Sequence, residues 1–183
     1  MFVFAAIFMF HLIYEIFGQA ILWYKYKTGS NLFPTTFILG NDVGWSQNQW
    51  TIPIQVKMKF RINYPFSTVQ CVTGLYPNFS QIIHNLLGFT FMTLFFYLSY
   101  RCFKEMAKDS IFNLKAIQWL RRFCALNLAL GIFGLIEFFF NKDNSGVTFI
   151  TYLFFAFFGM IIFFIVEFFK KGLELQSEND LTI

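Results

Sequence analysis

The sequence predicts an all-α integral membrane protein with four transmembrane helices arranged as two hairpins and a small extracytoplasmic β-hairpin-like loop. Of its 183 residues, 57% are hydrophobic and only 13% are charged, whereas about a quarter of the residues in a soluble domain are charged. Four apolar stretches are long enough to cross a hydrocarbon core of about 30 Å, because a helix rises about 1.5 Å per residue. We therefore expect a single membrane domain over residues 1–183.

The first predicted span covers residues 2–24. We interpret it as a retained helix, because it lacks the basic start and the small-residue cleavage site of a signal peptide. His11, Glu15 and Gln19 recur every four residues and so lie on one stripe of this helix. Ionisable groups inside a membrane cost about 2.5 to 3.5 kcal/mol each and normally face protein or water. The stripe therefore either holds the helix bundle together through hydrogen bonds, which we call a structural pin, or forms a site for a proton or a ligand.

Residues 25–80 form a long loop that we expect on the extracytoplasmic side. Apolar and polar residues alternate strictly over residues 51–64, which is the pattern of a half-buried strand. The shorter run at residues 67–73 could pair with this strand as a hairpin. One face of such a ribbon needs cover, which either the ends of the membrane helices or a partner could supply.

The second span, residues 81–100, leads into a basic connector at residues 101–122. After a cap at Asp109 or Ser110, apolar residues recur at helical spacing over residues 111–123, which predicts a helix lying along the membrane surface. The basic side chains of the connector indicate membrane topology and lipid headgroup contact rather than nucleic-acid binding. These side chains are Arg101, Lys104, Lys108, Lys115, Arg121 and Arg122.

The third span covers residues 123–140. Asn127, Gly131 and Gly134 share one face of it, and small and polar residues of this kind allow membrane helices to approach closely. Glu137 lies near the end of the span and is expected either to reach water or to serve as an intramembrane polar group.

The fourth span covers residues 147–169, and a short acidic tail occupies residues 170–183. Glu167 precedes Lys170 by three residues, which predicts an ion pair at the interface. We expect the regular helix to end at Gly172, because glycine commonly terminates helices.

Positive charge favours an orientation in which both termini and the connector are cytoplasmic. This arrangement places eight Lys and Arg residues inside and six outside. Lys25 and Lys27 count against it, but three of the outside charges lie deep in the long loop, where the rule has little weight.

Nothing in the sequence matches a catalytic signature. It has no HExxH, no CxxC, no nucleophile elbow and no phosphate-binding glycine loop. Cys71, Cys102 and Cys124 form neither a disulfide framework nor a metal-binding spacing. We therefore expect a protein that is not an enzyme and that uses no cofactor and no metal.

The C-terminal segment FFKKGLELQSENDLTI resembles the C-terminal signature of a bacterial four-span membrane protein family catalogued as domain of unknown function, family 2975. The residues that carry this resemblance are Gly172, Leu175, Glu178, Asn179, Asp180, Leu181, Thr182 and Ile183. The segment IFNLKAIQWLRRFCAL is similar to the family's connector into its third span. The resemblance implies a bacterial cytoplasmic (inner) membrane protein of unassigned activity. Family members are often encoded beside a small helix-turn-helix regulator, which implies a cytoplasmic regulatory partner. The basic residues themselves predict no direct contact with nucleic acid.

Three functional hypotheses follow from these observations. The first is a non-enzymatic regulatory or accessory membrane protein that acts through a partner. The second is a small transporter or channel, formed as a membrane oligomer, that uses His11 and Glu15. The third, an intramembrane enzyme, has the least support, because no spacing in the sequence links these residues to a further catalytic group.

Overall fold

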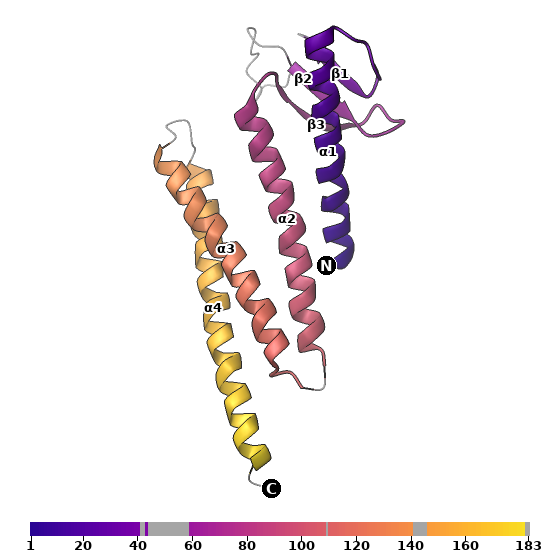
Figure 1. The fold of residues 1–183 in the computed structure, drawn as a ribbon. Helices are drawn as coiled ribbons and strands as arrows, with labels where there is room; N and C mark the ends of the chain where they lie inside the picture. The colour runs from indigo at the N-terminus through magenta and orange to yellow at the C-terminus, as the bar shows by residue number, and fades with distance from the viewer. Residues whose placement is uncertain (41–42, 44–58, 109, 141–145, 182–183) are drawn as a thin grey trace. The chain divides into compact units, whose positions relative to one another are not determined.

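The computed structural model describes residues 1–40, 43, 59–108, 110–140 and 146–181, and within them it contains four helices and three strands (Figure 1). In chain order these are α1 (Phe2–Thr28), β1 (Phe37–Gly40), β2 (Lys59–Asn63), β3 (Gln70–Leu75), α2 (Phe79–Met106), α3 (Leu114–Phe140) and α4 (Gly146–Leu181). All four helices are long and apolar enough to cross a membrane. The predicted fold class is therefore confirmed.

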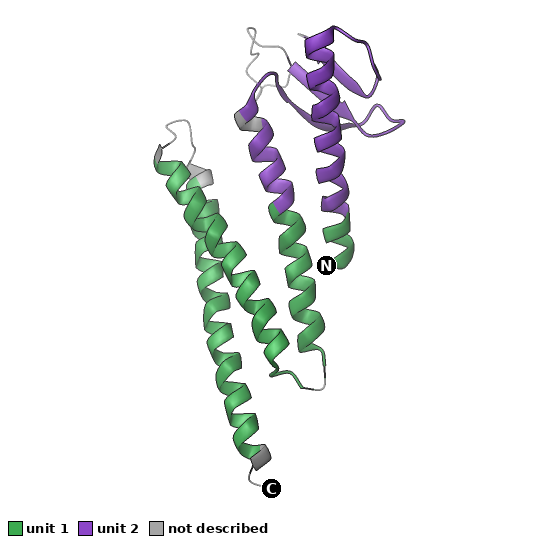
Figure 2. Ribbon diagram, viewed as in Figure 1, with its two compact units in different colours: residues 1–6, 91–183 green, residues 7–90 purple. Residues whose placement is uncertain are grey.

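The chain divides into two compact units (Figure 2). Residues 7–90 contain the three strands with the adjoining parts of α1 and α2, and we call this part the sheet unit. Residues 1–6 and 91–183 contain α3, α4 and the rest of α2, and we call this part the helical unit. The assignment of one membrane domain, with its loops on stated sides of the membrane, stays a prediction.

The strands form an antiparallel sheet in the order β1-β2-β3. The pairing of β2 with β3, in which Arg61 lies opposite Thr73, confirms the predicted hairpin. Strand β1 was not predicted; it pairs with the other edge of β2, where Ile38 lies opposite Arg61. Its sequence, FILG, lacks the alternation that reveals a half-buried strand. Residues 51–58 of the predicted strand lie outside the described residues.

The core of the sheet unit lies between α1 and one face of the sheet. Leu22, Phe60 and Ile62 are fully buried there and cluster with Phe37. Gly18 allows α1 to approach the sheet closely, since a Cβ atom at this position would lie 2.7 Å from Cδ1 of Ile62. The sequence left open whether the membrane helices or a partner would cover one face of the hairpin. In the structure, α1 covers it.

The start of α3 differs from the prediction. No separate surface helix precedes it, because α3 runs without interruption from Leu114 to Phe140. Its cap is Asn113, whose Oδ1 accepts a hydrogen bond from the backbone N–H of Ala116 at 2.8 Å. The predicted cap at Ser110 is therefore wrong, and Asp109 lies outside the described residues.

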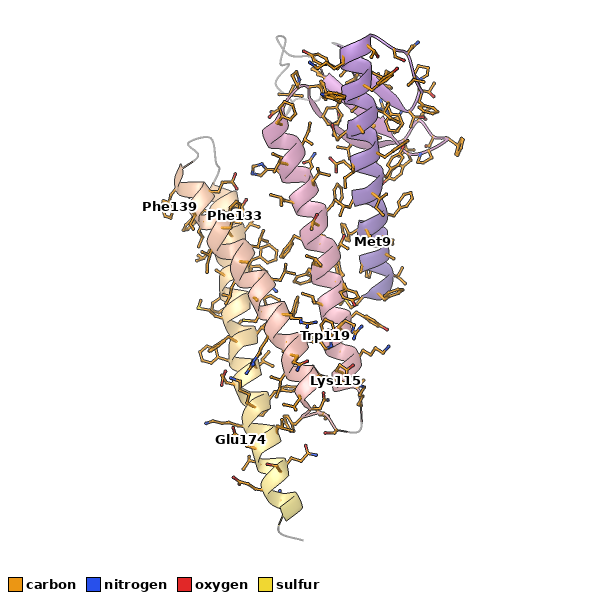
Figure 3. All side chains as sticks on the ribbon, in the orientation of Figure 1. Met9, Lys115, Trp119, Phe133, Phe139 and Glu174 are labelled. Carbon is orange, nitrogen blue, oxygen red and sulfur yellow. The ribbon has the colours of Figure 1, made fainter. Side chains whose placement is uncertain are left out.

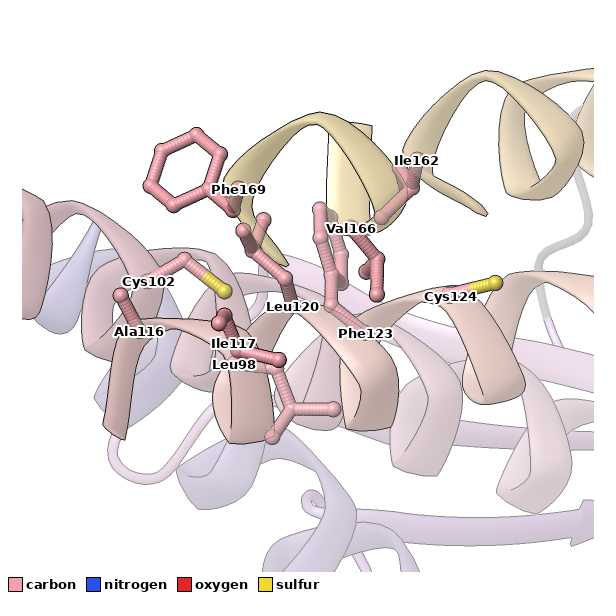
Figure 4. Close-up of a cluster of buried hydrophobic side chains, with 10 residues drawn as sticks. All are labelled: Leu98, Cys102, Ala116, Ile117, Leu120, Phe123, Cys124, Ile162, Val166 and Phe169. Carbon is pink, nitrogen blue, oxygen red and sulfur yellow. The ribbon is translucent and has the colours of Figure 1, made fainter. Parts of the chain in front are cut away.

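The later part of the apolar stripe that suggested a surface helix, Ile117, Leu120 and Phe123, packs into the core of the helical unit, whereas Ile111 and Leu114 are exposed. A stripe of this spacing fits a protein core as well as a membrane surface, and periodicity alone does not distinguish them. Figure 4 shows the buried side chains of this core, which come from α2, α3 and α4. They are Leu98, Cys102, Ala116, Ile117, Leu120, Phe123, Cys124, Ile162, Val166 and Phe169.

Small residues bring α3 and α4 together, as the sequence predicted. A Cβ atom on Gly131 would lie 2.5 Å from the backbone nitrogen of Ala156, so the two backbones are nearly in contact. Close to the same seam, the thiol of Cys124 donates a hydrogen bond to the carbonyl oxygen of Gly159 at 3.3 Å.

Helix α4 continues beyond Gly172 to Leu181, so the predicted helix end at Gly172 is wrong. A Cβ atom on Gly172 would lie 2.6 Å from the ring of Phe112, which shows that this glycine serves packing rather than termination. A glycine inside a helix costs only about 1 kcal/mol, which such packing can offset. The predicted ion pair between Glu167 and Lys170 is present.

We predict that Gly131→Ala destabilises the protein by about 1 to 3 kcal/mol, because the added methyl group must displace the backbone of α4. Gly88→Ala is the matched control, since Gly88 lies in α2 with nothing within 4 Å of the added Cβ atom. It should leave stability unchanged or raise it by up to about 1 kcal/mol. Thermal unfolding in lipid nanodiscs measures both changes. Equal effects of the two substitutions would contradict the close approach of α3 and α4.

Candidate functional site

The predicted stripe on α1 faces other polar side chains of the sheet unit. Nδ1 of His11 lies 3.7 Å from Sγ of Cys71, which is on β3. The His11 ring also contacts Tyr64, with ring centroids 5.5 Å apart, and stacks on Phe89 of α2 at 5.9 Å. His11 is therefore partly buried and contacts α2 and the hairpin.

Glu15 lies one turn further along α1 and is only 1% exposed. Gln19, on the same helix, and Asn85, on α2, are the polar side chains nearest to its carboxylate. Nevertheless, both carboxylate oxygens of Glu15 and both amide atoms of Gln19 are buried without a well-formed hydrogen bond. Buried polar groups normally have hydrogen-bond partners. Asn85 and Gln19 lie close enough to interact with the Glu15 carboxylate, but their geometry fills its hydrogen-bonding capacity only in part.

We call His11, Glu15, Gln19, Tyr64, Cys71 and Asn85 the polar cluster. Three of them come from α1, two from the sheet and its β2–β3 connection, and one from α2. Among the described residues, no three His, Cys, Asp or Glu side chains are placed to hold a metal ion together. What the cluster offers chemically is hydrogen bonding to a polar ligand.

The thiol of Cys71 is neutral at physiological pH. Burial raises its pKa most strongly, a hydrogen bond from Tyr64 opposes this in part, and the nearby Glu15 carboxylate raises the pKa by a smaller amount. Burial also raises the pKa of the Tyr64 hydroxyl, and so does its interaction with Cys71. A neutral thiol can donate to Nδ1 of His11, which then carries its proton on Nε2. Tyr64, Cys71 and His11 thus form a short hydrogen-bonded chain.

Further hydrogen bonds hold α1 against the sheet, one within the stretch of α1 that carries the cluster and one beyond it. The hydroxyl of Tyr14 donates to the carbonyl oxygen of Asn63 at 2.6 Å, and the ammonium of Lys25 donates to the carbonyl oxygen of Phe37 at 2.6 Å. The amide of Asn63 in turn donates to the carbonyl oxygen of Thr35 at 2.8 Å. These bonds fix the register between α1 and the sheet, and hence the geometry of the polar cluster.

Asn127 and Glu137, the other predicted intramembrane polar residues, belong to the helical unit and not to the cluster. Asn127 is fully buried, and its amide donates to the carbonyl oxygen of Phe123 at 2.8 Å. Its Oδ1 atom is buried without a hydrogen bond. Glu137 is half-buried and is a hydrogen-bonding partner of Tyr152 on α4. Asn127 therefore bonds within α3, whereas Glu137 connects α3 to α4.

The residues of the predicted basic connector lie on helices α2 and α3 and between them, and the predicted tail residues up to Leu181 lie on α4. Thr182 and Ile183 are outside the described residues. Lys108 forms an ion pair with Glu105 at 2.5 Å. Figure 3 labels Lys115 and Trp119 near the start of α3.

Sequence reasoning found half of the polar cluster. His11, Glu15 and Gln19 were identified by their spacing, whereas Tyr64, Cys71 and Asn85 were not assigned to a site. Tyr64 and Cys71 fall within the predicted hairpin, where no spacing connects them to α1. The only available signal was Asn85, a polar side chain at the beginning of an apolar span.

Comparison with known proteins identifies a protein family. The model of a family described as "Protein of unknown function (DUF2975)" matches residues 50–183. No curated protein and no solved structure matches the chain. The matched region contains Tyr64, Cys71 and Asn85, whereas His11, Glu15 and Gln19 precede it.

We predict that Cys71 reacts with iodoacetamide only at higher pH than an unstructured thiol, whose pKa is about 8.5, because burial and Glu15 raise the pKa of the thiol. Glu15→Gln removes one of these causes and should shift the reaction profile toward lower pH. Mass spectrometry of the Cys71 peptide gives the rate at each pH. Glu137→Gln removes the same charge from the helical unit and should not shift the profile. A reaction midpoint for Cys71 at or below that of a free peptide thiol would contradict the described surroundings.

Proposed function

We propose a function from the polar cluster, because the chain belongs to the family of proteins of unknown function DUF2975, whose description assigns no activity. The proposal is a non-enzymatic regulatory or accessory membrane protein. Its input site is the polar cluster, and its output is the binding of a cytoplasmic partner. The four helices that could cross a membrane support a multi-pass arrangement.

The observation that carries this proposal is that Glu15 and Gln19 are buried and that the protein fills their hydrogen-bonding capacity only in part. The cluster joins two helices to a sheet, so a polar ligand that filled this capacity would favour one arrangement of the three elements. A ligand shifts an equilibrium only through such a difference in affinity between states. No catalytic step is needed for this role.

The output surface that we propose lies where the α2–α3 connection meets α4. Phe112 of that connection contacts Phe169 with ring centroids 5.2 Å apart and packs against Gly172. Helix α4 has 36 residues and is about 54 Å long at 1.5 Å per residue, whereas a hydrocarbon core is about 30 Å thick. Its polar end, from Lys170 onward, therefore extends beyond the hydrocarbon core if the preceding apolar part spans it.

The order of the helices along the chain supports placing this surface and both chain ends on the same side of the membrane. If all four helices span, the α2–α3 connection and the two ends lie on one side, and the two other connections lie on the opposite side. The basic residues of the connector favour the cytoplasm for the first side. We therefore propose a bacterial inner-membrane protein that binds a small helix-turn-helix regulator through this surface.

We predict that Glu174→Lys weakens binding of a co-expressed helix-turn-helix regulator by tenfold or more. Glu174 is exposed on the polar end of α4, and reversing its charge should repel a basic partner surface. Lys27→Glu is a control that changes an exposed charge on the proposed opposite side of the membrane. Co-purification of the regulator with the full-length chain from detergent gives the bound fraction. Failure of the wild-type chain to retain any regulator would reject this output surface.

A transporter or channel is the second candidate function, and the same Glu15 favours it. An acidic side chain in the first candidate span with no well-formed hydrogen bond is a typical feature of an ion pathway. Four helices enclose little space, so a membrane oligomer would be needed to form a pore.

Glu15→Gln distinguishes the two functions. The regulatory proposal predicts that this variant accumulates normally in the membrane and loses the response of a reporter controlled by the regulator. Wild-type protein in liposomes should then show no more ion flux than empty liposomes. Flux that Glu15→Gln abolishes would favour the transporter. A variant that fails to accumulate would identify Glu15 as a structural pin and reject both roles for it.

A further inference from the structure

Two arginines of the helical unit share one indole ring. The Cζ atom of Arg101 lies 4.3 Å from the ring centroid of Trp119, and the Cζ atom of Arg122 lies 4.5 Å from the same centroid. The two guanidinium groups are therefore no more than about 9 Å apart. Trp119 and Arg122 lie one turn apart on α3, while Arg101 comes from α2, so the site forms only where these helices meet.

The guanidinium groups have donors that the protein leaves unfilled. Arg101 makes one long hydrogen bond, of 3.4 Å, to the hydroxyl of Tyr97, and its Nε is buried without a partner. Within the described part of the chain, Arg122 contacts Trp119 but makes no hydrogen bond or ion pair. Glu105 lies near Arg101, but its hydrogen bond goes to Lys108. Among the described residues neither arginine forms an ion pair with a carboxylate, which indicates that an anion from outside the chain can bind here.

The position of the site along the helices matches the membrane interface. Arg101 precedes the end of α2 at Met106 by five residues, and Trp119 follows the start of α3 at Leu114 by five. Both therefore lie about 8 Å inside their helix ends, at 1.5 Å per residue. Tryptophan, tyrosine and arginine concentrate at this depth, beside the lipid headgroups.

We propose that Arg101, Trp119 and Arg122 form a binding site for the phosphate group of an anionic phospholipid. A guanidinium group presents paired N–H donors that match two phosphate oxygens, and the indole holds both groups through cation–π contacts. Lys104 and Lys115 add positive charge nearby, as Lys104 lies over Tyr100 and Lys115 is in the first turn of α3. The site is independent of the polar cluster and of the function proposed for it.

The test compares lipid binding by native mass spectrometry of the full-length protein. Detergent-solubilised protein is titrated with phosphatidylglycerol or with phosphatidylcholine, and the retained lipid is counted. Wild-type protein should prefer phosphatidylglycerol by about tenfold. Arg101→Gln and Arg122→Gln should each reduce that preference by fivefold or more. Lys171→Gln is the matched control, because it removes an exposed positive charge on α4.

Trp119→Leu and Arg122→Lys test the geometry rather than the charge. Arg122→Lys keeps the charge but loses the paired donors, and Trp119→Leu removes the indole; both should lower the preference. Equal retention by Arg101→Gln, Arg122→Gln and wild type would overturn the proposal, as would an equal loss in Lys171→Gln. Inorganic phosphate is added in a parallel titration. Displacement of lipid by millimolar phosphate would support the phosphate site, whereas retention of phosphate with no preference between the two lipids would overturn a lipid ligand.

Discussion

The contact between α1 and β2 at Gly18 is the constraint on which the sheet unit depends. Without a side chain at this position, Ile62 and Phe37 pack directly against the helix, and α1 covers the apolar face of the sheet. The same approach brings β3 beside the turn of α1 that carries His11, because β3 is paired in register with β2. A larger residue at position 18 would separate the helix from the sheet and disperse the polar cluster.

Close contact of backbones also organises the helical unit, but there it packs two helices against each other rather than a helix against a sheet. Gly131 brings α3 against Ala156, where dispersion contacts replace the hydrophobic effect that is absent between helices in lipid. Its polar side chains are largely bonded within the unit, as Glu167 pairs with Lys170 and Glu137 with Tyr152. Glu15 differs because it is almost fully buried and its neighbours Asn85 and Gln19 satisfy its carboxylate only in part, which is the exception that calls for a functional explanation.

The sequence was sufficient to predict the four helices, the hairpin and the α1 stripe, because each depends on a local period. It failed at β1, whose four residues carry no alternation, and at residues 111–123, where a stripe facing a core looks like one facing headgroups. Gly172 was misread because termination and close packing both favour glycine. Cys71 and Tyr64 could not be assigned to a site, since their neighbours on α1 are more than fifty residues away along the chain.

The two candidate binding sites, at Trp119 and at Glu15, differ in how accessible their hydrogen-bonding groups are. At Trp119, the cations are held by an aromatic ring near the ends of helices, where headgroups can reach them. At Glu15, the acceptors lie beneath a sheet that hydrogen bonds from Tyr14 and Lys25 fasten to the helix, so a ligand must either be small or loosen those bonds to enter. Loosening them would couple occupancy of the polar cluster to the position of the sheet against α1. This coupling is what a sensor requires, whereas a channel requires a path that stays open, and the tie between sheet and helix therefore favours regulation.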